Sequence, residues 1–520
     1  MNGESLSAFT SEDGVTSEDD VVRHTKDVVL TRPGLSPPTF FAVENGQILV
    51  SRALTPLLAS LRGKPGLCVP RLASLLTLST PEDGWLTPYE GVYRIPTHHL
   101  VHVWPDGGRT SAMLSRSIAP ADGITAEEAI HELRARLTRV IARYAAGKQR
   151  IAILVGGGVD SSAVLATTLA WARSASGPEI KAIALHFGGP GDDRPYMRDL
   201  VDALGIVPIR LPPSVAGPLV RRMLVLDCAP FPWPNAAFEG AGLVAARNEG
   251  ADVVWGGAGG DDLYEGETGT LATEARQGHV YDAFRKAVAL RTPWREPGLS
   301  QAWDFVIRPL LGRYQPAAVR RFRRQRSMRD SLALAGPALR AYLEQRATQP
   351  EPSAANTPAA RYARFVTLPY LMESSDLSAQ LHRELGIERA DPLQDDTLIE
   401  FVSSLPPALL FHGGRTRGLF RAAMQGLVPD SVRLRRDKAA FEPAMAESVQ
   451  AAGGFAAFED LAAVPKLAGL GLVSAKAFRP IFDALARDSE WWGAGWLRVW
   501  PALAVEAFLA GLQGAEREAC

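Results

Sequence analysis

The segment Ile151–Ser162 constrains the fold of this chain more than any other. Its first five residues are apolar and run directly into three glycines, which are followed by a valine, an aspartate and two serines. This order predicts a buried strand, a tight loop and the start of a helix. Such a turn directs backbone N–H groups and a helix N-terminus at one point, which suits a phosphate group. A glycine-rich turn in an ordinary α/β domain is the other interpretation of this segment alone.

The residue types in this loop suggest individual roles. Asp160 is placed to hold Mg²⁺, whereas Ser161 and Ser162 can donate hydrogen bonds to phosphate oxygens. The glycines allow the backbone to approach a pyrophosphate closely. Because no Gly-Lys-Ser/Thr ending is present, the segment is not a Walker A loop. The nucleotide-binding residues predicted here are Val155, Gly156, Gly157, Gly158, Asp160, Ser161 and Ser162.

Composition limits the class of protein. The 520 residues are 46% hydrophobic and 22% charged, as expected for a globular protein of roughly two to four domains. The net charge of −1 provides no basic field, so no nucleic-acid partner is expected. Three widely spaced cysteines fit a reducing cytoplasm. No apolar run reaches the ~18–20 residues that span a bilayer, and no signal peptide is evident, so we expect a cytoplasmic protein without a membrane partner.

The first part of the chain divides into a lead and a small domain. Residues 1–26 are rich in Ser, Glu, Asp and Gly, which predicts a flexible acidic lead. Residues 27–118 contain short apolar stretches separated by turn residues, which predicts a β-rich domain. Its expected elements are strands at Phe40–Val43, Gln47–Val50 and Leu100–Trp104 and short helices at Leu54–Leu61 and Val69–Leu78.

Residues 125–515 show the alternation of an α/β domain. A capping box opens a predicted helix at Thr125–Ala146. Helical patterns then separate predicted strands, which favours a parallel sheet with right-handed crossovers and a ligand site at the carboxyl ends of the strands. Beyond about residue 275 the pattern is mostly helical. The strands are expected at Ile151–Val155, Ile180–Phe187, Ile206–Leu211 and Ala251–Gly256.

A second glycine-rich segment, Gly256–Gly266, follows the fourth predicted strand. It carries Asp261 directly after two glycines, at the carboxyl end of the strand. Asp160 and Asp261 could therefore converge on one Mg²⁺ beside a triphosphate, as hard oxygen ligands. A second loop with surface acids is the alternative interpretation.

Several segments, taken in order, resemble the asparagine synthetase family of ATP-pyrophosphatases. The resemblance covers roughly residues 28–510, and no single motif would establish it. Gly156–Ser161 resembles the family's Ser-Gly-Gly-x-Asp-Ser pyrophosphate loop. The other matching segments are Gly257–Tyr264, Glu388–Asp395, Arg417–Arg421, Leu427–Pro429 and Arg436–Phe441, with Asn45–Arg52 and Tyr89–Pro96 similar to the glutaminase-like domain.

This resemblance implies a fold class and cofactors. The implied fold is an N-terminal β-rich glutaminase-like domain of the N-terminal-nucleophile (Ntn) type at residues 27–118. A parallel-sheet ATP-pyrophosphatase synthetase domain with a helical C-terminal part follows at residues 125–515. The implied cofactors are ATP and Mg²⁺, with Asp160 and Asp261 as metal ligands.

Departures from the family pattern point to one subgroup. An active glutaminase of this family has a cysteine after the initiator methionine, whereas this chain has Asn2, so we expect no glutaminase activity. Ala258 stands where asparagine synthetases have a glutamate and β-lactam synthetases have a tyrosine that helps to deprotonate the amine. A small residue leaves space for a peptide. The chain is thus most similar to the lasso-peptide macrolactam synthetases.

The resemblance implies a reaction and partners. ATP would adenylate an Asp or Glu side chain of a ribosomally made peptide, and the peptide's N-terminal amine would displace AMP. The expected partners are a precursor (core) peptide, a leader peptidase and a leader-binding protein. The alternatives are a related amide ligase such as a β-lactam synthetase and a nucleotide-binding pseudoenzyme scaffold. Gly156 motivates the second alternative, because it replaces the family's loop serine and removes one hydroxyl donor.

Individual roles follow from the same resemblance. Lys438 matches the family's lysine and is expected to stabilise the oxyanion. Glu388 is a candidate to orient or deprotonate the amine, and a salt bridge to a nearby arginine is its other interpretation. Leu185 and His186 end the second strand where adenine is expected, His186 through its backbone or packing. Gly257 and Gly259 complete the predicted nucleotide site.

Overall fold

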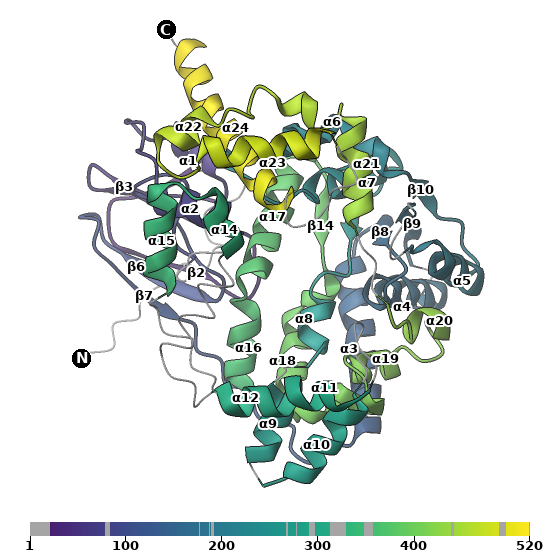
Figure 1. Cartoon of the computed structure of the whole chain (residues 1–520). Helices are drawn as coiled ribbons and strands as arrows, with labels where there is room; N and C mark the ends of the chain where they lie inside the picture. The colour runs from purple at the N-terminus through teal and green to yellow at the C-terminus, as the bar shows by residue number, and fades with distance from the viewer. Residues whose placement is uncertain are drawn as a thin grey trace, which may run out of the picture.

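The computed structural model shows a β-rich N-terminal part, a parallel α/β part and a large set of helices (Figure 1). The described residues are 21–78, 84–175, 177–186, 188, 192–266, 269–276, 278–290, 297–312, 329–347, 357–437, 441–487 and 496–518. In Figure 1 the N-terminal strands lie on the left, β8 and β9 on the right, and α17 between them.

The N-terminal part consists of two antiparallel sheets. Their inward positions are filled by Val, Leu, Ile and Phe, and burial alternates along β2, as expected for strands with one face on a core. One sheet has the order β1-β4-β3-β5 and the other β2-β6-β7. The strands are β1 (Val21–His24), β2 (Val28–Arg32), β3 (Phe40–Glu44), β4 (Gln47–Ser51), β5 (Val92–Arg94), β6 (His99–Val103) and β7 (Arg109–Met113).

These elements correct one predicted boundary. The flexible lead was expected to extend to residue 26, but Val21–His24 forms β1 and pairs with β4. Apolar Val21 and Val22 allow this strand to pack beside the apolar β4. The predicted lead therefore ends before Val21. The two short helices are α1 (Leu54–Ala59) and α2 (Val69–Leu76), which end slightly earlier than predicted.

The second part contains the predicted parallel sheet, with five strands in the order β10-β9-β8-β13-β14. Every neighbouring pair is parallel. The capping box of Thr125 begins the preceding helix as predicted, because its side chain accepts from the Glu128 N–H. The strands are β8 (Arg150–Val155), β9 (Glu179–Leu185), β10 (Ile209–Leu211), β13 (Val253–Trp255) and β14 (Glu388–Ala390), and the helices that lead into or connect them include α3 (Ala126–Ala145), α4 (Val159–Ala175), α5 (Arg194–Leu204) and α7 (Ala236–Asn248).

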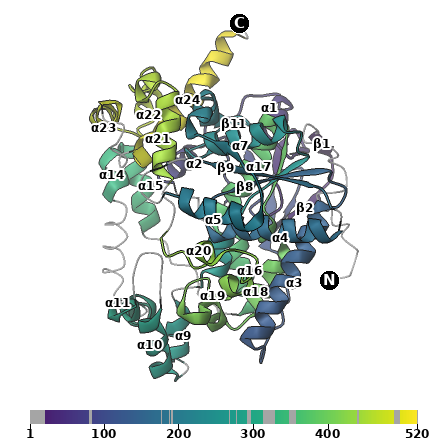
Figure 2. The same cartoon turned by 90° about the vertical axis from the view of Figure 1, so that its right-hand side faces the viewer.

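The rest of the described chain is mainly helical. In both views, α22–α24 lie at one end of the molecule and α9–α11 at the opposite end (Figures 1 and 2). The remaining elements are α6 (Gly217–Val220), β11 (Val225–Leu226), β12 (Ala229–Pro230), α8 (Gly260–Tyr264), α9 (Gly269–Arg276), α10 (Val280–Ala289), α11 (Leu299–Ala302), α12 (Arg308–Gly312), α14 (Arg329–Leu334), α15 (Pro337–Ala347), α16 (Pro358–Val366), α17 (Pro369–Leu385), α18 (Asp396–Ser404), α19 (Gly418–Ala423), α20 (Asp430–Arg433), α21 (Glu442–Ala451), α22 (Pro465–Gly469), α23 (Ala475–Arg487) and α24 (Trp496–Glu518).

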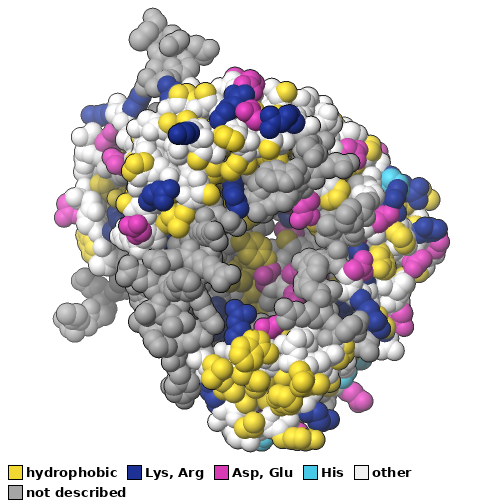
Figure 3. Space-filling model, viewed as in Figure 1, with side chains coloured by type: hydrophobic (Ala, Val, Ile, Leu, Met, Phe, Trp, Pro, Cys, Tyr) yellow, Lys and Arg dark blue, Asp and Glu magenta, His cyan; other side chains and the backbone are white. Residues whose placement is uncertain are grey.

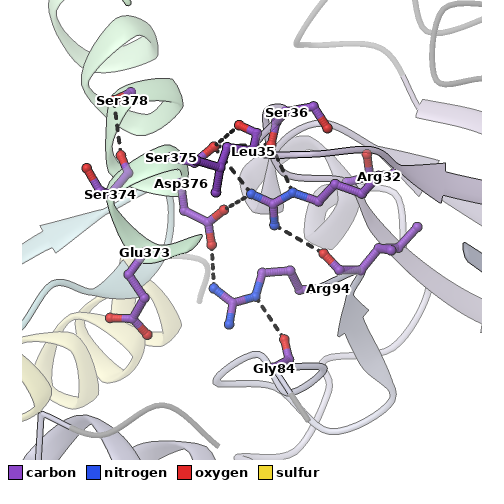
Figure 4. Close-up of polar contacts among 12 residues, drawn as sticks. Arg32, Leu35, Ser36, Gly84, Arg94, Glu373, Ser374, Ser375, Asp376 and Ser378 are labelled. Carbon is purple, nitrogen blue, oxygen red and sulfur yellow. Dashed lines mark hydrogen bonds and ion pairs between the residues drawn. The ribbon is translucent and has the colours of Figure 1, made fainter. Parts of the chain in front are cut away.

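A buried ion-pair cluster joins the N-terminal part to α17 (Figure 4). Asp376 of α17 accepts from Arg32 of β2 at 2.7 Å and from Arg94 of β5. The side chain of Arg32 is 0% exposed and that of Asp376 is 9% exposed. Burial opposes ionisation, but the two guanidinium groups outweigh it and hold the pKa of Asp376 below its ordinary value. These ion pairs hold the N-terminal part against α17, because separating the two would leave buried charges without a partner.

Replacing Asp376 with alanine should lower the free energy of unfolding by about 3–5 kcal/mol, because two buried guanidinium groups lose their carboxylate. Asp27→Ala is the control. It removes a half-exposed carboxylate that contacts His102 at 2.7 Å, and should change stability by less than about 1 kcal/mol. Denaturant unfolding followed by circular dichroism gives both values, and equal effects would contradict the assigned role.

The same cluster has a defined pH dependence. Since the folded-state pKa of Asp376 is lowered, its contribution is complete above the unfolded carboxyl pKa of about 3.9 and is lost as pH falls through the folded value. The stability difference between the wild type and Asp376→Ala should therefore shrink below about pH 4.

Candidate nucleotide and substrate site

The loop between β8 and α4 is held by its own hydrogen bonds. The Gly156 N–H donates to Ser161 Oγ at 3.2 Å, and Ser162 Oγ donates to the Gly156 carbonyl at 3.3 Å. Ser162 is completely buried, so its hydroxyl fixes the loop. Asp160 lies in the first turn of α4, where the helix dipole favours a negative charge.

Two residues that were not predicted support this loop. Asp193, which precedes α5, accepts from the Gly157 N–H at 2.9 Å. Arg435 forms an ion pair with Asp193, donates to the Gly157 carbonyl at 3.1 Å, and stacks 3.9 Å from the centre of the Tyr196 ring. A Cβ at Gly156 would lie 3.0 Å from Asp193 Oδ2. Glycine at position 156 thus leaves room for the Asp193 carboxylate.

The second glycine loop packs directly on the first. A Cβ at Gly257 would lie 2.8 Å from Ser161 Cα and overlap the Ser161 backbone nitrogen. A Cβ at Gly260 would lie 2.6 Å from Asp160 Oδ1. Gly259 has φ +85°, which favours glycine. The repeated glycines are therefore required by the contact between the loops and by backbone conformation.

The contact between the loops brings Asp160 and Asp261 together, and Arg417 lies against both. Arg417 Nη1 is 2.8 Å from Asp160 Oδ2 and 2.6 Å from Asp261 Oδ1. Burial opposes the charge of Arg417, but the two carboxylates outweigh it and raise its pKa. For Arg421, one turn further along α19, burial and the charge of Arg417 lower the pKa to about 10. The sequence singled out Arg417 and Arg421 only as positions of a family motif, and it did not predict the contacts of Arg417 with the aspartates.

The two carboxylates match Mg²⁺ in chemical type. Asp160 and Asp261 supply the hard oxygen donors that this ion prefers, and a bound ion would neutralise phosphate charge there. Among the described residues, no group of three or more His, Cys, Asp or Glu side chains is arranged to hold a metal. The donor set is therefore the carboxylate pair, with the guanidinium of Arg417 beside it.

A cavity of about 360 Å³ lies at the carboxyl edge of the sheet, within the range of small-molecule sites. Hydrophobic and acidic side chains line the hollow that Figure 3 shows in this face of the molecule, near α8 and β14. Phe238 and Phe441 stack in its wall with ring centres 5.9 Å apart. The predicted residues that line it are Val155, Gly156, Gly158, Asp160, Ser161, Leu185, Gly257 and Asp261.

The structure places Glu388 away from this cavity. It is the first residue of β14, aligned with Val253 at the amino edge of the sheet, and its exposed carboxylate pairs with Lys148 at 3.0 Å. Glu388 is not among the residues that line the cavity, so the geometry lends no support to the amine-activating role expected for it. The salt-bridge interpretation fits, with a lysine in place of an arginine. The next residue, Arg389, lines the cavity together with Glu239, a residue that was not predicted.

The other predicted residues occupy supporting positions. The His186 N–H donates to the Leu211 carbonyl at 2.8 Å, and its side chain is exposed. His186 does not line the cavity, and its backbone or packing contribution to the adenine site stays a prediction. Gly157 and Gly259 belong to the two loops without lining the cavity. Lys438 lies outside the described residues.

A parallel α/β sheet with a glycine loop at the carboxyl end of a strand is a common arrangement in nucleotide-binding proteins. A sequence model described as asparagine synthase matches residues 132–510. This chain therefore belongs to the asparagine synthase family, and that membership indicates an ATP-using, ligase-type enzyme that forms amide bonds. No protein with curated annotation matches the chain.

One similar solved structure is the "U34-tRNA thiolase NcsA from Methanococcus maripaludis with its [4Fe-4S] cluster". It is 15% identical, over 52% of this chain and 80% of that chain, with a TM-score of 0.21. None of the described helices is both long and apolar enough to cross a membrane.

Gly257→Ala should abolish nucleotide binding, because the new Cβ would overlap the Ser161 backbone and separate the two loops. Gly63→Ala is the control, since a Cβ at this exposed glycine of the N-terminal part has no atom within 4 Å. Isothermal titration with ATP and Mg²⁺ checks both variants, with circular dichroism to show that each is folded. Tight binding by Gly257→Ala would contradict the loop contact.

Proposed function

We propose that this chain is a macrolactam synthetase that closes an isopeptide ring in a ribosomally made lasso peptide. The observation that carries the proposal is one cavity that joins the glycine loop of β8 to the small residue Ala258. The loop supplies a phosphate site. Ala258 leaves open the space where a related small-substrate enzyme would place a glutamate or tyrosine.

The proposed reaction has two steps. An Asp or Glu carboxylate of the peptide attacks the α-phosphorus of ATP, and pyrophosphate leaves. The N-terminal ammonium then loses a proton to solvent, and the free amine attacks the acyl carbon. The acyl–oxygen bond breaks, AMP leaves, and the new amide loses its second proton. Holding both peptide ends in one cavity supplies much of the rate.

Several residues support this chemistry. Asp160 and Asp261 would hold Mg²⁺, which supplies charge neutralisation to the pyrophosphate. Leu185 lines the apolar side of the cavity, where adenine would lie. Lys438 would stabilise the oxyanion of the second step. A precursor peptide is the substrate, and a leader peptidase and a leader-binding protein are the proposed partners.

A nucleotide-binding scaffold without catalysis is the second candidate. The contacts of Arg417 with both Asp160 and Asp261 favour it, because they compete with a metal ion for the carboxylates. Peptide- and Mg²⁺-dependent pyrophosphate release would exclude this candidate. A β-lactam synthetase is less well supported, since Ala258 has no side-chain acid or hydroxyl.

Asp160→Ala should reduce peptide-dependent exchange of pyrophosphate into ATP by at least about 100-fold, because it removes a proposed metal ligand. Asp199→Ala is the control, an exposed aspartate on α5. Isotope exchange with candidate core peptides gives the rates, and mass spectrometry detects the loss of one water on ring closure. An active Asp160→Ala enzyme, or exchange with small amino acids alone, would contradict the proposal.

The N-terminal part is proposed to lack glutaminase activity. Cys68 is the one cysteine in residues 21–113, and it is 7% exposed, immediately before α2. A buried thiol at a helix start has little access to glutamine. Incubation with glutamine, ATP and Mg²⁺ should release no ammonia above background in a coupled glutamate dehydrogenase assay, and steady release would show that the activity exists.

A further inference from the structure

One wall of the cavity is built from a continuous chain of polar contacts beside Ala258. The Ala258 N–H donates to Asp391 Oδ1 at 3.3 Å, and Asp391 Oδ2 is 3.4 Å from Arg389 Nη2. Arg389 Nη1 pairs with Glu239 Oε2, and Asn235 Nδ2 donates to Glu239 Oε1 at 2.7 Å. Strand β14 and helix α7 thus place a fixed carboxylate in the cavity.

The charges of this wall do not balance. Two carboxylates share the single guanidinium of Arg389, so one formal negative charge is left over. The side chains of Arg389 and Asp391 are each 7% exposed, whereas that of Glu239 is 21% exposed. Arg389 Nε is buried and has no hydrogen-bond partner among the described residues. The excess charge is therefore accessible to a ligand only through Glu239.

Glu239 retains the capacity to bind a cation. Each carboxylate oxygen has two lone-pair sites, and its bonds to Asn235 and Arg389 use one on each oxygen. Glu239 lies in the first turn of α7, where the positive end of the helix dipole faces its carboxylate. The neighbouring Phe238 and Phe441 rings provide an apolar surface, which strengthens a charge-assisted hydrogen bond.

The other carboxylates of the cavity are more fully engaged. Asp160 and Asp261 share Arg417, and a second cation, Arg421, lines the cavity near them. Asp193 pairs with Arg435 and is buried. Asp437 also contacts Arg435 and accepts from the Tyr196 hydroxyl, and its side chain is 53% exposed, where water screens its charge.

We propose that Glu239 binds the α-amine of the peptide substrate in its ammonium form, with Asn235 and Arg389 fixing the orientation of the carboxylate. This subsite rests on the proposed function, because it assigns the place of the attacking amine in that reaction. In this proposal Glu239, and not Glu388, is the carboxylate that orients the amine. The role is binding and orientation, and the ligand class is the free N-terminus of a peptide.

The test compares a free and a blocked N-terminus. The probe is a synthetic core peptide that supports pyrophosphate exchange, labelled with fluorescein at its carboxyl end, and the same peptide acetylated at its N-terminus. Wild-type enzyme should bind the free peptide about tenfold more tightly at pH 7, from the loss of one charge-assisted hydrogen bond on acetylation. The preference should shrink by pH 9, because a peptide ammonium titrates near pH 8.

Glu239→Gln should bind both peptides equally at either pH, and Glu239→Asp should restore part of the preference. The control is Glu249→Gln, at the other end of the same helix, which should keep the full preference. Pyrophosphate exchange reports adenylation separately, and Glu239→Gln should retain it within about threefold while ring closure falls. A tenfold preference that survives in Glu239→Gln would overturn this inference alone. Absence of peptide-dependent exchange in the wild type would overturn the proposed function, and this subsite with it.

Discussion

The contacts of Arg417 with Asp160 and Asp261 are the interaction on which the site depends. Each aspartate follows a different strand of the sheet, and both carboxylates lie beside one guanidinium. Two carboxylates that contact the same nitrogen atom would repel one another without the cation between them. The backbone contact of Gly257 with Ser161 sets the approach of the loops, and Arg417 makes that approach electrostatically stable.

The same constraint organises the surrounding charges. Arg435 links the first loop to Asp193, and Arg389 links the end of the sheet to α7 through Glu239. Each guanidinium therefore ties a strand end or glycine loop to an element from a distant part of the sequence. Arginine suits this use because it remains charged when buried and presents several donors in a fixed plane. Arg389, Arg417 and Arg435, which form these linkages, all line the cavity.

The sequence predicted four of the five parallel strands, because β8, β9, β10 and β13 each lie in an apolar run between helical patterns. It could not predict β14, which has only three residues, two of them charged, and pairs with β13 far away in the chain. Which of Glu388 and Arg389 faces the cavity depends on the register of that pairing, because adjacent side chains of a strand point to opposite faces. The convergence of the two glycine loops was predictable from their places at strand ends. Glu239, Asp193 and Arg435 were not, since no motif marks them and their partners are distant in sequence.

The buried cluster around Asp376 bears on why the N-terminal part is present at all. Its strands share a hydrophobic core with α7, α17 and α24, and Arg32 and Arg94 neutralise a carboxylate that belongs to α17. Removal of these strands would leave an isolated anion on an apolar surface of the ligase part. The N-terminal strands therefore complete the core and the charge balance of the ligase part, and this structural contribution does not depend on any chemistry of their own.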